Sequence, residues 1–377
     1  MSIRRLLALR APLYLQKAQN LGLLPNPYAN GLCIDDDFVA NKRTVVGVYT
    51  PSTILRAPFI RPRESRGYDI KLNIAGDQFD RSVSFGFYDL EDVRIWPRFG
   101  VHSTSIGVLK DYYCYPALTN PKYEIPRLFL PLAPTRSFSE GVYLGPSFYH
   151  NFYHWMIDIV PRLSTVAHLL GSGLPLFVPR YINSVQNDVL KFALRELDLE
   201  GIQIVRLGGA PCRFDRLVMP TAMSAPLDVS PAQRSFLRDI IPEVPTGRKK
   251  RIYISRRDAQ VRRITNEIEI QSLLNDYGFE TVTLSEKSIE QQANIFRGAE
   301  AIVAHHGAGL TNLAFCSPST LAIEIFHDGH FSPSFARLAQ LGELKYGFGI
   351  GDPVGSDTWL DPNQLRELLE SSELDRR

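Results

Sequence analysis

The stretch "AIVAHHGAGLTNLAF" (residues 301–315) joins a short apolar run to two histidines and a glycine turn. The apolar run predicts a buried strand, and a short helix is expected to begin near Leu310. Glycine lets the backbone approach a ligand closely, and a helix starting there would aim free N–H groups at an anion. A tight strand–helix turn whose glycines serve packing alone is the alternative interpretation.

Strands and helices alternate on both sides of this turn. We expect strands at 251–256, 280–284, 300–305, 320–326 and 344–350, and helices at 266–278, 288–299, 332–342 and 361–372. This rhythm predicts a doubly wound α/β domain with a parallel sheet. Ligands of such sheets bind beyond the carboxyl ends of the strands, which is where the glycine turn lies.

The first half of the chain has a weaker pattern. Residues 40–150 read as mixed strands and turns, and a helix is expected from Tyr153 to about Leu170. Short strands and one helix between 174 and 220 indicate a parallel α/β sheet here too. Residues 221–250 hold four prolines and a basic run, so we place the domain linker there, with a helix near 231–241.

Two other predicted strands carry groups that suit a nucleotide diphosphate. Ser255-Arg256-Arg257 follows the first strand of the second half, and arginine suits phosphate oxygens. Glu324 lies inside the apolar strand "LAIEIF", where a carboxylate needs a partner. A ribose diol is one candidate partner, and a neighbouring arginine is the other. The G-x-G-x-x-G and Walker A patterns are absent from the sequence.

The first half offers one reactive group of side chains. His150, His154 and Asp158 are spaced by four, which predicts a shared helix face that Arg162 extends. A histidine with a carboxylate one turn away can act as a base, because the carboxylate fixes the tautomer. A metal triad and a structural network are the alternatives. Asp35-Asp36-Asp37 is interpreted as a solvated turn.

Composition limits the function classes. The 377 residues favour two domains, and a net charge of +2 argues against a nucleic-acid partner. Four widely separated cysteines fit reduced thiols and a cytoplasmic location. The sequence contains no run of 18 apolar residues, so no membrane span is expected. The basic, apolar segment 1–25 could lie on the inner face of a membrane or pack as a helix on the protein.

Three segments together resemble glycosyltransferase family 61, in its bacterial capsular-polysaccharide branch. They read "NFYHWMIDIVPRL" (151–163), "RIYISRRDAQVRRITNE" (251–267) and "HHGAGLTNLAFCSPSTLAIEIF" (305–326). The family's typical forms are N-F-x-H-W…D…P-R, S-R-x-x-A…R…N-E and H-G-A-G-L-T-N before an acidic strand, and they occur here in that order. His305 is a departure, since a small or polar residue commonly precedes the matching histidine. The first 140 residues match no family motif and are expected to determine the acceptor.

The resemblance implies a GT-B-like α/β fold, in which two Rossmann-type domains face each other across a cleft. It implies inverting transfer of a hexose or pentose from a nucleotide-diphosphate donor, expected to be UDP-linked, without an essential metal or other cofactor. The acceptor would be a saccharide or glycolipid in surface or capsular polysaccharide synthesis. We expect an acceptor-side domain over 1–225, a nucleotide-sugar-binding domain over 226–350, and a terminal helix in 351–377 that returns to the first domain.

On matching positions, the resemblance assigns His154 and Asp158 to the catalytic or acceptor side, with His154 favoured as the proton acceptor. The implied donor contacts are Arg256, His306, Gly307, Ala308, Gly309, Leu310, Thr311, Asn312 and Glu324. The substrate-binding set is completed by Asn151, Arg162, Ser255 and Arg257 from the same segments. Two other functions stay open: a metal-dependent hydrolase that uses His150, His154 and Asp158, and a non-catalytic nucleotide-sugar-binding protein.

Overall fold

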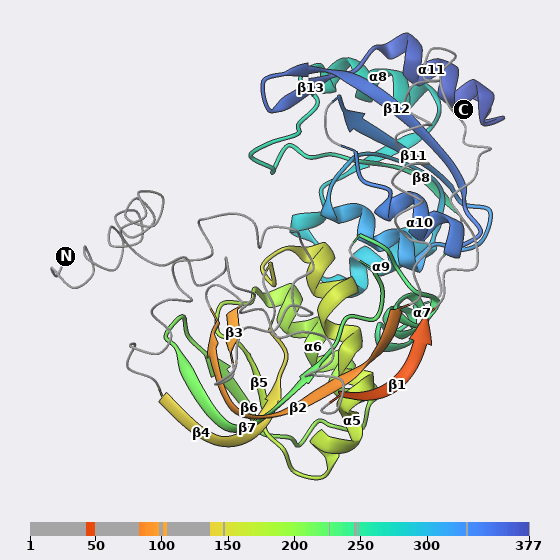
Figure 1. The fold of residues 1–377 in the computed structure, drawn as a ribbon. Helices are drawn as coiled ribbons and strands as arrows, with labels where there is room; N and C mark the ends of the chain where they lie inside the picture. Colours follow the sequence, from red (N-terminus) through yellow and green to blue (C-terminus); the bar gives the residue numbers. More distant parts are fainter. Residues whose placement is uncertain are drawn as a thin grey trace, which may run out of the picture.

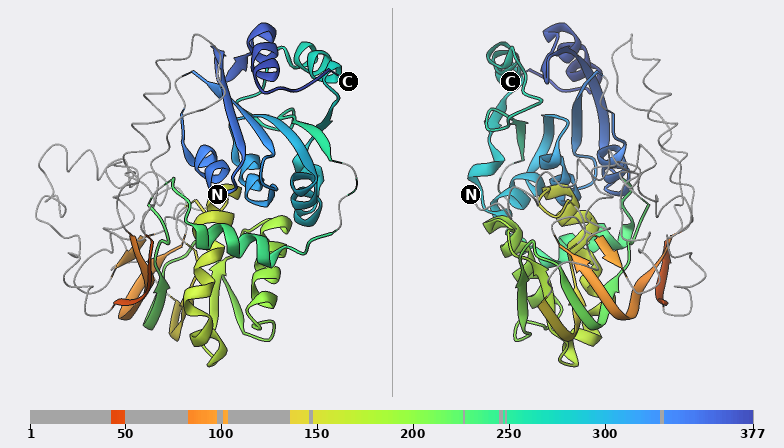
Figure 2. Two further views of the ribbon diagram at one scale, coloured as in Figure 1. Left: turned by 90° about the vertical axis from the view of Figure 1, so that its right-hand side faces the viewer. Right: turned by 60° about the vertical axis from the view of Figure 1, so that its left-hand side comes forward.

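The computed structural model describes residues 43–49, 83–97, 101–103, 136–145, 148–225, 227–244, 247, 249–328 and 331–376. Within these residues the chain forms two sheets, which lie in two stacked lobes (Figures 1 and 2). The α/β class expected from the sequence is confirmed. The possible membrane segment 1–25 and the turn Asp35–Asp37 lie outside the described residues.

The second sheet follows the expected alternation strand by strand. Its strands are β8 (Lys250–Ile254), β9 (Phe279–Val282), β10 (Ala299–His305), β11 (Leu321–His327), β12 (Lys345–Val354) and β13 (Asp357–Trp359). Their order is β13-β12-β11-β10-β8-β9, and all neighbours are parallel except β12 and β13. The hairpin to β13 was not expected from the sequence. It turns at Gly355, whose φ of 64° favours glycine.

Helices cover both faces of this sheet. They are α8 (Glu267–Asp276), α9 (Ile289–Arg297), α10 (Ser334–Leu341), α11 (Pro362–Ser371) and the 3-10 helices η5 (Leu284–Glu286) and η6 (Ala308–Phe315). In Figure 1, α8 and α11 lie on the far side from the first lobe, and α9 and α10 lie towards it. The glycine turn with η6 therefore sits on the side of the sheet that meets the first lobe.

The terminal helix α11 packs on the second lobe, so the expectation that residues 351–377 return to the N-terminal domain was wrong. Leu365 and Leu368 are fully buried in an apolar cluster shared with α8. Gln364 Oε1 accepts from the backbone N–H of Ile350 at 2.8 Å, which fixes the helix on β12. The physical reason is the short connection from β13, which leaves an apolar helix face beside the sheet that the chain has just left.

The first sheet is mixed rather than purely parallel. It has the order β1-β2-β7-β4-β5-β6, with β3 paired to β2. Its strands are β1 (Arg43–Tyr49), β2 (Val83–Trp96), β3 (Val101–Ser103), β4 (Arg136–Tyr143), β5 (Leu176–Pro179), β6 (Ile204–Leu207) and β7 (Cys212–Pro220). The neighbours from β7 to β6 are parallel, whereas β1, β2 and β3 pair antiparallel. Residues 97–100 are too short a link for the crossover that a parallel β2–β3 pair would need.

The helix expected from Tyr153 forms, but its first part is irregular. It consists of the π-helix η3 (His154–Ile159), the 3-10 turn η4 (Val160–Arg162) and the α-helix α5 (Leu163–Gly171). Pro161 has no N–H, and its ring crowds the carbonyl of Ile157 one turn earlier. Gln233 Nε2 donates to that carbonyl at 2.9 Å. The π-helical part directly before Pro161 contains both His154 and Asp158, and π-helical turns are frequent at functional sites.

Helix α7 (Pro231–Ile240) forms where a helix was expected in the linker region, and it joins the lobes. It contacts η3, η4 and α6 (Ser184–Glu196) on one side and η6 and α10 on the other. Arg238 Nη1 donates to the carbonyls of Phe315 and Cys316 at 3.3 and 3.2 Å. One apolar cluster runs through both lobes, so this region is a packed interface. The domain boundaries stay a prediction.

Among the described helices, none is long and apolar enough to cross a bilayer.

Candidate active site

The glycine turn lies at the carboxyl end of β10, and its histidine is held by the next two strands. His306 Nδ1 is hydrogen-bonded to Glu324 Oε1 of β11, and Tyr346 of β12 donates its hydroxyl to Glu324 Oε2. Burial next to this carboxylate raises the pKa of Tyr346 well above its usual value, so the phenol stays protonated and remains a donor. The three residues form one buried network.

Glu324 therefore has other partners than the two expected from the sequence. Its side chain is 1% exposed, and both carboxylate oxygens are engaged within the protein. A ribose diol would have to displace one of these bonds. Arg262 lies near enough for the Glu324 charge to raise its pKa, but no arginine of the described chain forms an ion pair with this carboxylate. The geometry instead makes Glu324 the group that orients His306.

Arg256 lies directly against the glycine turn. A Cβ atom at Gly307 would come within 2.0 Å of Arg256 Nη1, so only glycine leaves room for the guanidinium in this position. Arg256 Nε donates to the carbonyl of Arg262 at 3.1 Å, and Nη2 donates to that of Val261 at 3.3 Å. The chain after β8 thus folds back to hold this cation at the end of β10.

Arg262 places a second cation beside the first. Burial, followed by repulsion from Arg262, lowers the pKa of Arg256, and burial also lowers the pKa of Arg262. The charges of Asp258 and Glu324 act in the opposite direction and raise the pKa of Arg256 and Arg262, respectively. Neither carboxylate is within ion-pair distance of these two guanidinium groups in the described chain. Two partly buried cations held together in this way create a site that favours an anion. Arg262 was not among the residues expected from the sequence, although it stands in the second family-like segment.

His305 is a neutral structural residue beside this pair. Burial, with added repulsion from Arg256, His306 and Arg262, lowers its pKa to about 3. Its Nε2 lies 2.8 Å from the hydroxyl oxygen of Thr358 in β13. The unexpected hairpin therefore supports the histidine that departs from the family pattern.

The rest of the turn divides into an accessible part and a buried part. Ala308 and Gly309 are half-buried, whereas Leu310, Thr311 and Asn312 are buried. Asn312 Nδ2 donates to Gln292 Oε1 and to the carbonyl of Gly309, each at 3.0 Å. The side chains of Thr311 and Asn312 are fully buried, and their expected ligand contacts stay a prediction.

Ser255 and Arg257 are directed to other partners than an anion at the turn. Ser255 Oγ donates to Glu267 Oε1 at 2.7 Å and accepts from the N–H of Arg257 at 3.2 Å. Arg257 Nη2 forms an exposed ion pair with Glu286 at 3.3 Å. The structure therefore brings Arg256, but not Arg257, to the glycine turn.

In the first lobe, His154 and Asp158 form the expected pair. His154 Nδ1 lies 2.6 Å from Asp158 Oδ2, and both side chains are buried. If Nδ1 donates its proton to the carboxylate, Nε2 keeps the lone pair that a base requires. The carboxylate then fixes the tautomer and stabilises a developing imidazolium.

The other residues of this segment have local roles. Asn151 Oδ1 accepts from the N–H of Tyr153 at 2.9 Å and so supports the start of the helix. Arg162 is buried and donates to the carbonyl of Pro220 at 3.5 Å. His150 is exposed in the turn before the helix, so it does not share the helix face of His154 and Asp158. No three His, Cys, Asp or Glu side chains in the described ranges are placed to hold a metal ion.

An aromatic bridge connects the two candidate histidines. The ring of Tyr153 lies 5.4 Å from that of His154 and 5.8 Å from that of Phe335, measured between centroids. Phe335, on α10, lies 5.3 Å from the ring of His306. The histidines thus come from different lobes and face the same short aromatic bridge. Phe335 gave no signal in the sequence beyond its place on an apolar helix face.

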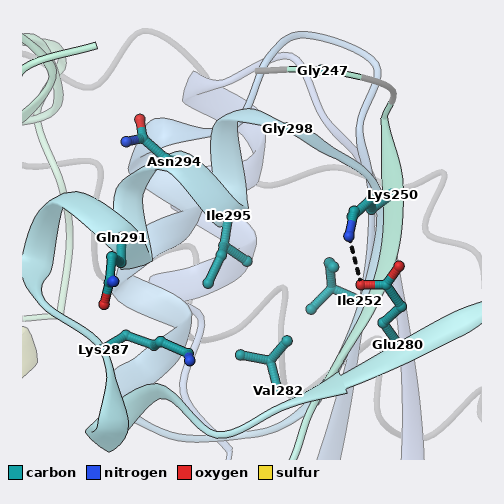
Figure 3. A pocket seen from close by; sticks show the side chains of 10 residues that line it. All are labelled: Gly247, Lys250, Ile252, Glu280, Val282, Lys287, Gln291, Asn294, Ile295 and Gly298. Carbon is teal, nitrogen blue, oxygen red and sulfur yellow. Dashed lines mark hydrogen bonds and ion pairs between the residues drawn. The ribbon is translucent and has the colours of Figure 1, made fainter. Parts of the chain in front are cut away.

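A hollow of about 520 Å³ lies elsewhere on the second lobe, between α9, strand β8 and the edge strand β9 (Figure 3). Lys250 and Glu280 form an ion pair across its wall at 2.8 Å. None of the site residues expected from the sequence lines it.

Comparison with known proteins agrees with the resemblance seen in the sequence. The family profile "Glycosyltransferase 61" matches residues 152–323. The match runs from the segment of His154 and Asp158 through Arg256 and the glycine turn, and it ends one residue before Glu324. Residues 152–323 are thereby similar to glycosyltransferase family 61.

One curated relative is the beta-1,2-xylosyltransferase XAX1 of Oryza sativa subsp. japonica. It is 27% identical over 232 residues, which cover 53% of this chain and 40% of the relative. The chain thus spans less than half the length of this relative. The relative is a plant enzyme, so the match does not extend to the bacterial capsular branch of the family.

Proposed function

We propose that the protein is an inverting glycosyltransferase that moves a sugar from a nucleotide-diphosphate donor to a saccharide acceptor. The observation that carries this proposal is Arg256 held against Gly307 beside Arg262, at the carboxyl end of a parallel sheet. Such a sheet edge is the usual place for a nucleotide ligand. The match to the family profile over residues 152–323 supports the same class of reaction.

In this proposal the diphosphate lies at the glycine turn, next to both arginines. They stabilise the negative charge that grows on the leaving diphosphate, which is the task that a metal performs in other enzymes. The transfer therefore needs no essential metal. UDP is the proposed nucleotide, and the name of the rice relative makes UDP-xylose the first donor to test.

The acceptor side is assigned to the pair His154–Asp158. The acceptor oxygen attacks the anomeric carbon as the bond from that carbon to the diphosphate oxygen breaks. The bonding electron pair leaves with the diphosphate, and His154 Nε2 takes the acceptor proton. Base catalysis of this kind contributes ~10²–10⁴-fold to the rate. The reacting groups would then meet between the lobes in a GT-B-like arrangement.

The cellular role proposed here is synthesis of a surface or capsular polysaccharide on the cytoplasmic side of a membrane. That role follows from the resemblance in the sequence. The basic segment 1–25 is the proposed point of peripheral membrane contact.

Calorimetry with UDP and GDP in the presence of EDTA tests the donor site. Micromolar to millimolar UDP binding is expected, and binding that requires added Mg²⁺ or Mn²⁺ would contradict the metal-independent proposal. UDP release from UDP-xylose, UDP-glucose and UDP-N-acetylglucosamine with saccharide acceptors tests transfer, and NMR of the product reads the anomeric configuration. UDP binding without release from any donor would favour the non-catalytic nucleotide-sugar-binding protein.

A further inference from the structure

A second hollow, of about 390 Å³, opens in the first lobe at the end of β5 and β6. Its walls are formed by Tyr149, Tyr181, Pro97, Pro179, Leu207, Gly208 and Gly209. This volume lies within the ~300–1,000 Å³ of typical small-molecule sites. Pro179 and Leu207 are the last residues of two neighbouring parallel strands, so the hollow occupies the sheet edge where ligands bind.

Two tyrosines give this hollow its chemistry. Tyr181 is 70% exposed although its ring is large and apolar, and the Arg180 guanidinium lies 5.9 Å from the ring centroid. Tyr149 lines the same hollow, and its main-chain carbonyl accepts from Gln186 Nε2 at the start of α6. A tyrosine offers an apolar face and a hydroxyl at its edge. Those are the features that a sugar ring, with apolar C–H faces and a rim of hydroxyls, can use.

The hollow is connected to the candidate base by a run of rings. Tyr149 contacts His150 edge-on at 5.9 Å, and His150 lies 6.4 Å from Phe148, between centroids. Phe148 in turn lies 5.6 Å from His154. A saccharide that fills the hollow would thus have its next residues beside the pair His154–Asp158.

We propose that the hollow between Tyr149 and Tyr181 is a saccharide subsite, which holds a sugar ring of the acceptor one or more residues away from the reacting hydroxyl. This inference rests on the proposed function, because only a transferase needs an acceptor next to its base. It places acceptor selection in the turn before His154 and in the loop after β6.

Glycine substitutions can fill the hollow without disturbing the fold. A Cβ atom at Gly208 would meet no atom within 4 Å, so Gly208→Leu adds a side chain to the lining of the hollow. Gly201 precedes the same strand, lies at its other end and is equally open, which makes Gly201→Leu a matched control. Tyr181→Ala removes the exposed aromatic face.

The experiment measures binding of xylotetraose, cellotetraose and chitotetraose by saturation-transfer NMR, on wild type and the three variants, with UDP present. We expect wild type and Gly201→Leu to bind at least one tetrasaccharide alike. Gly208→Leu and Tyr181→Ala should weaken it tenfold or more. Unchanged binding by Gly208→Leu, or no tetrasaccharide bound by wild type, would overturn the proposal.

UDP affinity, measured on the same four proteins, separates this proposal from the proposed function. The saccharide subsite predicts equal UDP affinity in all of them, because the hollow lies in the first lobe and the arginines in the second. Tetrasaccharide binding without any UDP binding would leave the subsite in place and remove the transferase assignment.

Discussion

The guanidinium of Arg256 lies against the backbone of Gly307, so that a Cβ atom at position 307 would fall 2.0 Å from Nη1. The backbone of Gly307 is extended, with φ of 169°, a conformation that any residue adopts. The glycine is therefore required for space and not for backbone freedom. This contact joins the ends of β8 and β10 at the candidate donor site.

Gly307→Ala should displace Arg256 and weaken UDP binding about tenfold, with a small loss of stability, because the obstacle is the flexible end of a side chain. Adding Gly307→Ala to Arg256→Ala should cost no further UDP affinity, since the clash is gone. Calorimetry and thermal melts of the two single variants and the double variant measure this. Fully additive losses of UDP affinity would show that the glycine acts independently of Arg256.

Arg256→Ala should weaken UDP binding by ~1.5–3 kcal/mol, which is the contribution of a hydrogen bond to a charged group. Arg257→Ala is the matched control, since Arg257 is exposed and paired with Glu286. It should leave UDP affinity within error of wild type. Equal losses in both variants would point to a general charge effect and remove Arg256 from a specific contact.

Sequence patterns predicted the second sheet well, because its strands are short apolar runs and its helices carry apolar residues at regular helical spacing. The strands around Ile252, Val303 and Ile323 are short, largely apolar and buried, and Glu324 is the charged residue inside the last of them. The same patterns misplaced the terminal helix. Leu365 and Leu368 mark an apolar face, but periodicity does not say which surface covers it.

The candidate site was predicted in part for a similar reason. Spacing alone placed His154 beside Asp158, because both lie on one continuous helix. The partners of Glu324 come from two other strands, and their approach depends on strand order and register. Residue spacing along the chain does not contain that information, so His306 and Tyr346 were not identified as its partners.

His305 should make the protein sensitive to acid. Its pKa is lowered to about 3 in the folded protein from the usual 6.5, so the folded state favours the neutral ring. The resulting stability is complete above pH ~6.5 and is lost as the pH falls towards 3. His305→Gln should reduce the fall in Tm between pH 7 and pH 4.5, whereas His150→Gln, at an exposed position, should not. Parallel Tm curves for wild type and His305→Gln would contradict this assignment.

Asp158→Asn tests the catalytic pair most directly. The amide keeps the shape of the carboxylate but loses the charge that fixes the His154 tautomer and stabilises its protonated form. We expect UDP affinity to stay unchanged and the transfer rate to fall by ~10²-fold or more. Asp188→Asn is a suitable control, because Asp188 forms an exposed pair with Lys191 on the surface of the same lobe.

Transfer at the wild-type rate would show that Asp158 is neither base nor orienting group. A large fall in Tm with an unchanged rate per folded molecule would instead assign His154 and Asp158 to a structural network, and the base would then be sought among the remaining residues of the first lobe.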